Sequence, residues 1–267
     1  MIRQARNYLA RWLSGQQPVK ISGKSATETA DQCLRLHQSG IIPQYEDILA
    51  DGYCRFLKDG DVAIDIGVNH GVHFDRLKEC VGPNGYVVGF EPVPDFVAIV
   101  HSRHGKVIDL RLKALSSEPG WGEFLHMTKS IGESGFKERT TSEDRGAKVI
   151  KVEISTLDIE FTGIPKIDFI KIDTEGHEIS ALKGGHEVIA RTRPIISVEY
   201  GSPTYSLYGL TAESLYDWAD ENGYGISDLF GNLVKSRKEW VYVCDRSYWD
   251  FFLVPREKAE IWPSVFA

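Results

Sequence analysis

The residues of this sequence that could do chemistry gather where two apolar runs end. The first such place is the stretch V-A-I-D-I-G-V-N-H-G at 62–71, in which a short apolar run leads into a glycine turn and a helix-length segment. Glycine allows the dihedral angles of a tight turn, and the start of a helix presents backbone N–H groups to a ligand. Gly67, Asn69 and Gly71 lack the Gly-x-Gly-x-x-Gly spacing that admits a pyrophosphate. The loop therefore predicts a nucleoside ligand without a phosphate.

Two carboxylates near this loop could bind opposite ends of such a nucleoside. Glu91 follows the next apolar run, at 86–90, and a carboxylate at that place can accept hydrogen bonds from both ribose hydroxyls. Asp65, at the edge of the first run, could meet an ammonium group directly or through water. S-adenosylmethionine has both a ribose and an amino-acid end, so the loop and its two acids fit this cofactor. Either acid could instead be a helix cap or a surface charge.

The second place is the stretch D-F-I-K-I-D-T-E-G-H-E at 168–178, together with I-I-S-V-E-Y at 195–200. Asp173, His177 and Glu199 in these stretches are candidate general bases for a hydroxyl nucleophile that loses its proton during transfer of a methyl group. The three side chains could also hold a divalent cation, although we do not favour this interpretation. As a further alternative, Asp173 could cap a helix that begins near His177.

Both places belong to a longer series of motifs. In order along the chain, the series is D-I-G-V-N-H-G at 65–71, F-E-P-V-P at 90–94, A-L-S-S at 114–117, F-I-K-I-D-T-E-G-H-E-I-S-A-L-K-G-G at 169–185 and I-I-S-V-E-Y at 195–200. This series resembles the FkbM family of S-adenosylmethionine-dependent methyltransferases, over roughly residues 50–255. The run Asp-x-Glu-Gly-x-Glu, at 173–178, is far more specific than the glycine loop.

The resemblance implies a Rossmann-like sheet of seven strands with helices on both faces, and methylation of hydroxyl oxygens on sugars or natural products. It assigns the ribose to Glu91 and the adenine to the neighbourhood of Lys113, Ala114 and Leu115. It assigns the methionine end to four residues of the first loop, namely Asp65, Gly67, Asn69 and Gly71. Two positions depart from the family's pattern: His70 and His73 stand where such sequences often have apolar or aromatic residues.

The elements that position these residues follow an α/β rhythm, because short apolar runs alternate with helix-length segments. Strands are predicted at 62–64, 86–90, 167–172, 195–198, 224–226 and 249–254, the last two joined through a turn at 231–232 and a charged loop. Helices are predicted at 46–58, 71–80, 94–103, 178–190 and 211–222. The segment 116–147, rich in Gly, Ser and Thr, predicts a mobile insertion, which could cover the acceptor together with the aromatic stretch 200–205.

The composition bounds the remaining expectations. The 267 residues, 42% hydrophobic and 26% charged, predict a domain at 46–267 preceded by a helical extension at 1–45. A net charge of −7 disfavours nucleic acid as a partner. Residues 1–20 are basic and could form a short amphipathic helix with weak contact to a membrane surface or a partner. The sequence contains no signal-peptide pattern, so a cytoplasmic location is expected, and its four scattered cysteines are expected to be buried thiols.

The sequence thus predicts an S-adenosylmethionine-dependent O-methyltransferase whose acceptor is a small molecule or a glycan. One competing hypothesis is a nicotinamide-dependent oxidoreductase or epimerase on a similar sheet. That class is disfavoured because the sequence lacks the third glycine of a Gly-x-Gly-x-x-Gly motif and contains no Tyr-x-x-x-Lys pair. A second competing hypothesis is a non-catalytic scaffold that the basic N-terminal segment holds at a membrane.

Overall fold

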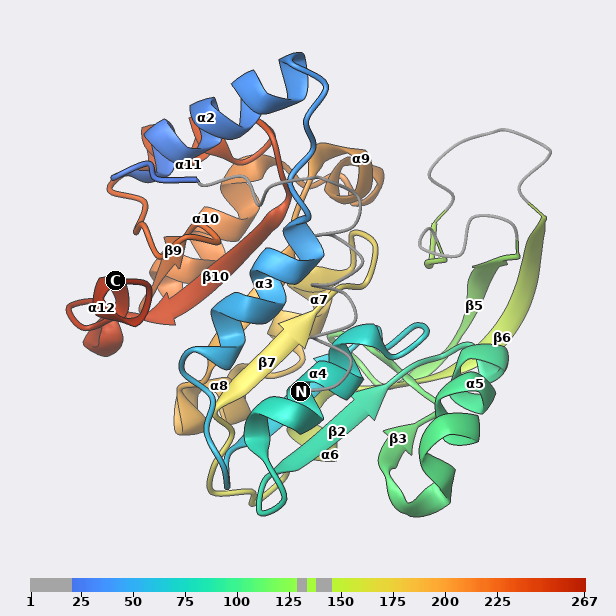
Figure 1. The fold of residues 1–267 in the computed structure, drawn as a ribbon. Helices are drawn as coiled ribbons and strands as arrows, with labels where there is room; N and C mark the ends of the chain where they lie inside the picture. Colours follow the sequence, from blue (N-terminus) through green and yellow to red (C-terminus); the bar gives the residue numbers. More distant parts are fainter. Residues whose placement is uncertain (1–20, 129–133, 138–145) are drawn as a thin grey trace, which may run out of the picture.

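The computed structural model describes residues 21–128, 134–137 and 146–267, and its centre is a seven-stranded sheet (Figure 1). From one edge to the other the strands are β3 (Asp109–Arg111), β2 (Tyr86–Phe90), β1 (Val62–Ile66), β7 (Phe169–Ile172), β8 (Ile195–Glu199), β10 (Asp250–Pro255) and β9 (Tyr224–Ser227). Strand β10 is antiparallel to both of its neighbours, and the other pairs are parallel. The predicted seven-stranded α/β sheet is therefore confirmed.

The central strands are buried on both faces, as their apolar runs predict. All four residues of β7 are buried, and one of them, Lys171, is a charged residue with only 3% exposure. In the sheet register, Lys171 is paired with Asp65 on one side and with Ser197 on the other. A polar row thus crosses the middle of an otherwise apolar sheet.

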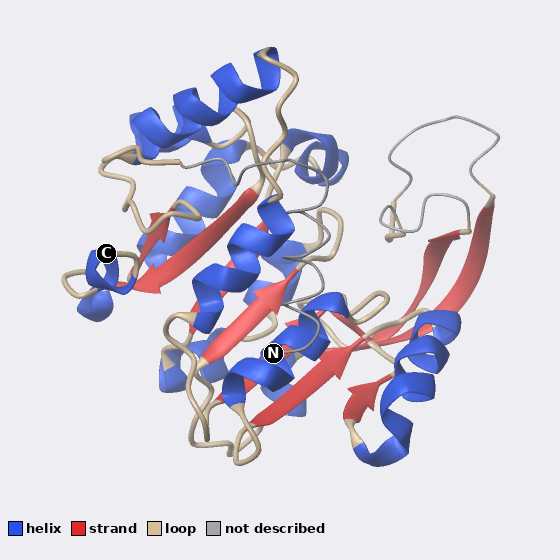
Figure 2. Cartoon of the chain, viewed as in Figure 1, coloured by secondary structure: helices blue, strands red, loops and turns tan. Residues whose placement is uncertain are grey.

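Helices cover this sheet on both faces (Figure 2). The helices α3 (Tyr45–Cys54) and α4 (Val72–Val81) cross in front of it, and α8 (His186–Thr192) and α10 (Ala212–Glu221) lie behind it. The remaining helices are α2 (Ala26–Gln38), α5 (Pro94–His104), α6 (Leu157–Glu160), α7 (Glu178–Lys183), α9 (Ser202–Tyr205), α11 (Arg237–Val243) and α12 (Trp262–Val265), with the short 3₁₀ turns η1 (Gly105–Val107), η3 (Ser206–Tyr208) and η4 (Arg256–Lys258). The predicted helix 178–190 is two helices, because Gly184 and Gly185 interrupt it where Gly184 approaches the backbone oxygen of Ser116.

Two connections differ from the prediction. The edges of the expected insertion 116–147 are strands, since β5 (Gly120–Met127) pairs antiparallel with β6 (Ala147–Ser155), and β4 (Ala114–Leu115) joins β6 on its other side. Phe124 and Val152 of this smaller sheet pack against Val93 and Phe96 in a separate apolar cluster. Residues 129–133 and 138–145 of the expected insertion lie outside the described residues. The expected charged loop before β10 contains the helix α11.

The N-terminal part of the described chain packs onto the body of the protein. Ala26, Ala30 and Cys33 of α2 are fully buried, and Asp31 of the same helix pairs with Arg246 at 2.7 Å. The predicted amphipathic segment 1–20 lies outside the described residues. Within the described part of the chain, no helix combines the length and the apolar character that crossing a membrane requires.

The expectation of four free thiols is wrong for one pair. Cys33 and Cys244 are free and buried, but Cys54 at the end of α3 and Cys80 in α4 form a disulfide, with Cα atoms 5.3 Å apart. The two helices lie side by side on one face of the sheet, which brings together residues that are 26 positions apart in the sequence. The sequence alone does not contain that packing, so the pair was not expected.

Candidate active site

A cavity of about 780 Å³ opens at the carboxyl ends of β1, β2 and β7. Because β1 lies between β2 and β7, the chain reverses the direction in which it adds strands at this point, and open α/β sheets bind ligands at such points. The volume lies within the range of about 300–1,000 Å³ that is usual for small-molecule and cofactor sites. The wall includes most of the predicted site residues, namely Gly67, Asn69, Glu91, Lys113, Ala114, Asp173 and Glu199.

The loop after β1 is shaped by residues in the left-handed region of backbone space. Gly67 has φ +86°, and a Cβ at that position would collide with the backbone oxygen of Asp173, so only glycine lets the loops after β1 and β7 approach so closely. Asn69 also has a positive φ, of 50°. Gly71, with φ +80°, precedes α4 and packs against the side chains of Val100 and Arg103. Gly71 therefore sets the helix start and is not among the described residues that form the cavity wall.

Glu91 fixes the same loop from the end of β2. Its Oε2 accepts a hydrogen bond from the Asn69 N–H (2.7 Å), and its Oε1 accepts one from the Val93 N–H (2.8 Å). The residue is 4% exposed, and burial raises the pKa of this carboxyl to about 7. Each carboxylate oxygen has a second lone pair, so Glu91 could still accept hydrogen bonds from ribose hydroxyls. Its predicted contact with the ribose remains a prediction that this geometry permits.

Asp65 lies inside β1, one position before the wall residue Ile66. Its side chain is fully buried, and neither carboxylate oxygen has a hydrogen-bond partner among the described residues. Burial raises the pKa of Asp65 to about 6, against the opposing charge of Lys171. Asp65 is not among the described wall residues, so a direct contact with an ammonium group remains a prediction only.

Asp173 and Glu199 form a coupled pair of carboxyl groups at the ends of two adjacent strands. The Lys171 ammonium lies 2.9 Å from Asp173 Oδ2. Burial acts to raise the pKa of Asp173, but Lys171 and a hydrogen bond from Glu199 outweigh it and hold the pKa at about 2. Burial, and after it the charge of Asp173, raise the pKa of Glu199 well above its ordinary value. The two carboxyl groups therefore titrate as a coupled pair, in which Asp173 loses its proton first and Glu199 keeps its proton to a higher pH.

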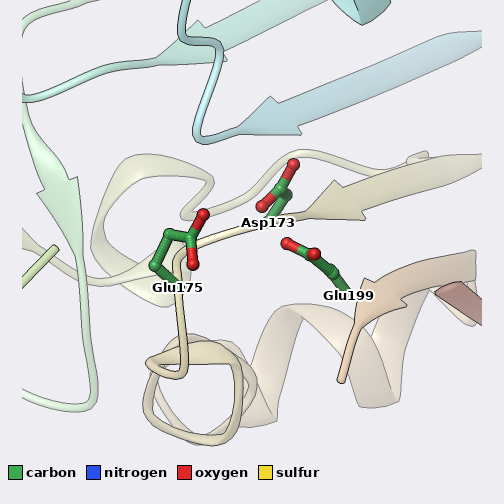
Figure 3. Close-up of side chains that lie close together, drawn as sticks. All are labelled: Asp173, Glu175 and Glu199. Carbon is green, nitrogen blue, oxygen red and sulfur yellow. The ribbon is translucent and has the colours of Figure 1, made fainter. Parts of the chain in front are cut away.

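A third carboxylate joins this pair. Asp173 and Glu175 come from the loop after β7, and Glu199 comes from the end of β8, with the three carboxylates close together (Figure 3). One oxygen from each lies within 4.8 Å of the others. Glu175 has φ +57°, a conformation that is uncommon outside glycine and frequent at functional sites. Glu175 is not among the site residues predicted from the sequence, although the Asp-x-Glu spacing directly after an apolar run is a signal for it.

His177 does not lie in this group. It precedes α7, and its Nε2 is 2.8 Å from Ser116 Oγ. Its ring packs against Phe136 (4.8 Å between centroids) and Tyr208 (5.4 Å). Burial lowers the pKa of His177 to about 4, so the ring is neutral at pH 7. His177 is not among the described wall residues, and the structure brings only Asp173 and Glu199 of the predicted bases together.

The opposite end of the cavity is more apolar. Ala114 and Leu115 line it together with Phe96 and Phe124, which suits the flat adenine that the resemblance assigns to this region. Lys113 lies beside them, and its Nζ is 3.0 Å from carboxylates of both Glu153 and Glu160. The two ion pairs fix the side chain of Lys113, which directly precedes the strand β4.

Two wall residues come from outside the expected constellation. Glu46, in the first turn of α3, accepts a hydrogen bond from His73 Nε2 (2.6 Å). His73 Nδ1 in turn lies 2.9 Å from the hydroxyl of Tyr53. His73 is one of the two positions that depart from the family's pattern. A histidine at that position is the feature of the sequence that could have indicated its contact with Glu46.

The wall as a whole suits a positively charged nucleoside. Among the described residues it contains the acids Glu46, Glu91, Asp173, Glu175 and Glu199 and two lysines, Lys113 and Lys171. Both lysines are already paired with carboxylates. Asn69 Oδ1 is buried without a hydrogen-bond partner among the described residues, so a ligand donor could satisfy it. These residues fit S-adenosylmethionine, which has a cationic sulfonium, an ammonium group and ribose hydroxyls.

Residues 65–226 match the model of the methyltransferase FkbM domain. The chain belongs to the FkbM methyltransferase family. This match covers more than half of the chain and confirms the family that the sequence motifs resemble. It also favours a methyltransferase over the nicotinamide-dependent alternative.

One curated relative of this FkbM family member is the hexuronic acid methyltransferase AglP of Haloferax volcanii. The two are 31% identical over 132 residues, which is 48% of this chain and 51% of AglP, so the chain spans about half the length of that relative. Among solved structures, the methyltransferase FkbM of Methylobacillus flagellatus KT has a TM-score of 0.49 at 13% identity, with 87% of this chain and 56% of that chain covered. The O-methyltransferase of Bacillus cereus has a TM-score of 0.44 at 13% identity, with coverage of 88% and 92%.

Proposed function

We propose that this protein transfers the methyl group of S-adenosylmethionine to a hydroxyl oxygen of a sugar, either free or within a glycan. The observation that carries the proposal is the Asp173–Glu199 pair, whose carboxylate oxygens lie within 4.8 Å of each other in the wall of the cavity. A sugar hydroxyl that becomes an ether must lose its proton, and this pair could accept it. The name of the relative AglP, a hexuronic acid methyltransferase, supports a sugar as the acceptor.

The residues of the chain divide between holding the cofactor and handling the acceptor. When bound, S-adenosylmethionine supplies an electrophilic methyl group on a positively charged sulfur. Glu91 and the loop that contains Gly67 and Asn69 would hold the nucleoside at the ends of β1 and β2. The acidic wall lowers the free energy of a bound cation. The protein's remaining tasks are to align the acceptor oxygen and to exclude water.

The acceptor side of the cavity combines acids with an aromatic ring. Phe136 lines it next to Gly135, where a Cβ would lie 3.3 Å from the Cβ of Glu175. The C–H face of a sugar ring can pack on this ring, while its hydroxyls can donate to Glu175 and Glu199. Asp173, which Lys171 keeps ionised, lies beside them and would orient the hydroxyl, while the ionised form of Glu199 would receive its proton.

The pair also predicts how activity depends on pH. A coupled pair titrates in two steps, and the fully ionised form is the stronger base. Since the pKa of Glu199 is raised well above its ordinary value of 4.5, activity should rise with pH through that upper step. The variant Glu199→Gln cannot lose this proton, so its profile should lack that rise.

The experiment is a panel of neutral sugars and uronic acids incubated with S-adenosylmethionine, with S-adenosylhomocysteine formation as the measurement. With a sugar that the wild-type protein methylates, Asp173→Asn and Glu199→Gln should each lower kcat by about 10²- to 10⁴-fold, the usual contribution of a general base. Asp217→Asn on α10, a half-exposed residue that is not among the described wall residues, is the matched control and should keep full activity. Full activity of both site variants with folding intact would contradict the proposed base.

A further inference from the structure

Glu46 is a cavity residue that the family match does not cover. The match begins at residue 65, whereas Glu46 belongs to α3, the helix before β1. Its carboxylate nevertheless lies in the cavity wall, at the end of the cavity where Lys171 and Asp173 act on it electrostatically. The helix α3 therefore adds an acid to the site from outside the region that defines the family.

The position of the Glu46 carboxylate is fixed by two buried side chains. A carboxylate only accepts hydrogen bonds, so His73 Nε2 must carry the proton of the 2.6 Å contact. The hydroxyl of Tyr53, a residue with 0% exposure, holds the other ring nitrogen at 2.9 Å. The side chain of His73 is only 10% exposed, but that of Glu46 is 69% exposed. A rigid support thus presents an accessible carboxylate at the rim of the cavity.

This carboxylate is ionised and still has room for a ligand. The hydrogen bond from His73 lowers the pKa of the Glu46 carboxyl. Only Oε2 has a hydrogen bond to His73, which leaves the other oxygen to accept from a ligand. Glu46 is therefore prepared to bind a cation.

The other acids of the cavity are less suited to an ammonium group. Asp173 is held by Lys171 at 2.9 Å and by the hydrogen bond from Glu199. Asp65 is buried in the sheet and is not among the described wall residues. Glu91 lies at the end of β2, on the far side of β1 from β7 and Lys171. A nucleoside whose ribose lies at Glu91 and whose chain extends across β1 would bring its other end to Glu46.

That end of S-adenosylmethionine is an amino acid with one ammonium and one carboxylate. The first turn of α4 begins with Val72 and His73, next to Glu46, and its N–H groups have no partner within the helix. Such a helix start attracts a carboxylate, while the adjacent acid attracts the ammonium. We propose that Glu46, held by His73 and Tyr53, binds the α-ammonium group of the methionyl part of S-adenosylmethionine. This inference rests on the proposed function and assigns to α3 the contact that the sequence assigned to Asp65.

Glu46 could have a purely structural role, because an acid in the first turn of a helix stabilises that helix. Two ligands separate the roles. S-adenosylhomocysteine contains the amino-acid tail, and 5′-methylthioadenosine contains the same adenosine and a thioether but no tail. A structural defect in α3 would weaken the binding of both ligands, whereas loss of an ammonium contact would weaken the binding of S-adenosylhomocysteine alone.

The experiment is isothermal titration calorimetry of the full-length protein with each ligand. Glu46→Gln should weaken the binding of S-adenosylhomocysteine by about 10- to 100-fold, as expected for the loss of one charge-assisted hydrogen bond. Its dissociation constant for 5′-methylthioadenosine should stay within about twofold of the wild-type value. His73→Phe, which removes the support of the carboxylate, should show the same selective loss. Glu79→Gln, an exposed acid on α4, is the control and should bind both ligands as the wild type does.

Three results would overturn the inference. If Glu46→Gln binds S-adenosylhomocysteine as tightly as the wild type, Glu46 does not contact the tail. If Glu46→Gln loses affinity for both ligands equally, its role is structural. If the wild-type protein binds neither ligand, the proposed function fails and this inference fails with it. The first two results leave the proposed function intact, so the two failures are distinguishable.

Discussion

The buried carboxyl group of Asp65 should make the stability of this protein depend on pH in a measurable way. Its pKa is raised from 3.8 to about 6, first of all by burial. A carboxyl group whose pKa is raised on folding stabilises the folded state fully below its unfolded pKa, and that stabilisation is lost as the pH rises through the folded pKa. For Asp65 the loss therefore falls between about pH 4 and pH 6.

The size of the effect follows from the shift. A difference of about 2 pKa units at about 1.4 kcal/mol per unit gives about 3 kcal/mol. Asp65→Asn removes the titration, so the free energy of unfolding of the variant relative to the wild type should increase by about 3 kcal/mol between pH 4 and pH 7.5. An amide at this site also has unpaired donors, which lowers the stability of the variant by an amount that is the same at every pH.

The assay is urea unfolding of both proteins at pH 4, 5, 6 and 7.5, because the difference between them removes the contribution of the other titrating groups. Asp51→Asn, an exposed residue on α3 that lies 3.5 Å from Arg76, serves as the control. The free energy of unfolding of Asp51→Asn should stay within about 0.5 kcal/mol of the wild-type value at each pH. A constant difference for Asp65→Asn from pH 4 to pH 7.5 would refute the assigned burial of this charge.

Three further predictions concern the disulfide and metal ions. The pair Cys54–Cys80 closes a loop of 26 residues, so Cys54→Ser with Cys80→Ser should lower the free energy of unfolding by about 3.5 kcal/mol relative to the oxidised protein, and an unchanged urea midpoint would contradict the bond. Disulfides are rare in the cytosol, so acid-trapped thiol labelling of the denatured protein also tests the expected cytoplasmic location. Four cysteines should be labelled if that location is right, and two if the protein is isolated with the bond formed. Dialysis against EDTA should leave methyl transfer unchanged, since Lys171 already neutralises Asp173, whereas a loss of activity that Mg²⁺ or Mn²⁺ restores would show that the three carboxylates hold a cation.

The sequence predicted six of the seven strands of the central sheet because their signals are local, and it missed the three-residue edge strand β3. Each central strand is a short apolar run that ends at a glycine or an acid, and Gly67 marks the loop after β1 without reference to the rest of the chain. The pairing of β5 with β6 was missed, because strand partners separated by a long segment rich in glycine and serine leave no local periodicity. The disulfide was missed for a similar reason, since it depends on how α3 packs on α4.

Within the site, residues that directly follow adjacent parallel strands were easy to bring together. Asp173 directly follows β7, and Glu199 is the last residue of the adjacent strand β8. Their proximity is therefore a consequence of strand order. Residues only a few positions further along were not predictable in this way. Glu175 and Gly176 both have positive φ, and these two turns carry His177 away from the carboxylates to Ser116. The direction of a chain after such turns is not encoded in spacing.

The same charge distribution that weakens the fold makes the cavity suited to a cation. Burial raises the pKa of Asp65 to about 6 and that of Glu91 to about 7, so ionising either group at neutral pH costs stability. Lys171 offsets part of this cost, but its ammonium is committed to Asp173 and does not enter the cavity as a free charge. A ligand that brings positive charge to the ends of β1 and β2 relieves the remaining repulsion, and an anionic ligand adds to it. The acids therefore select for a cationic nucleoside before any specific hydrogen bond is formed.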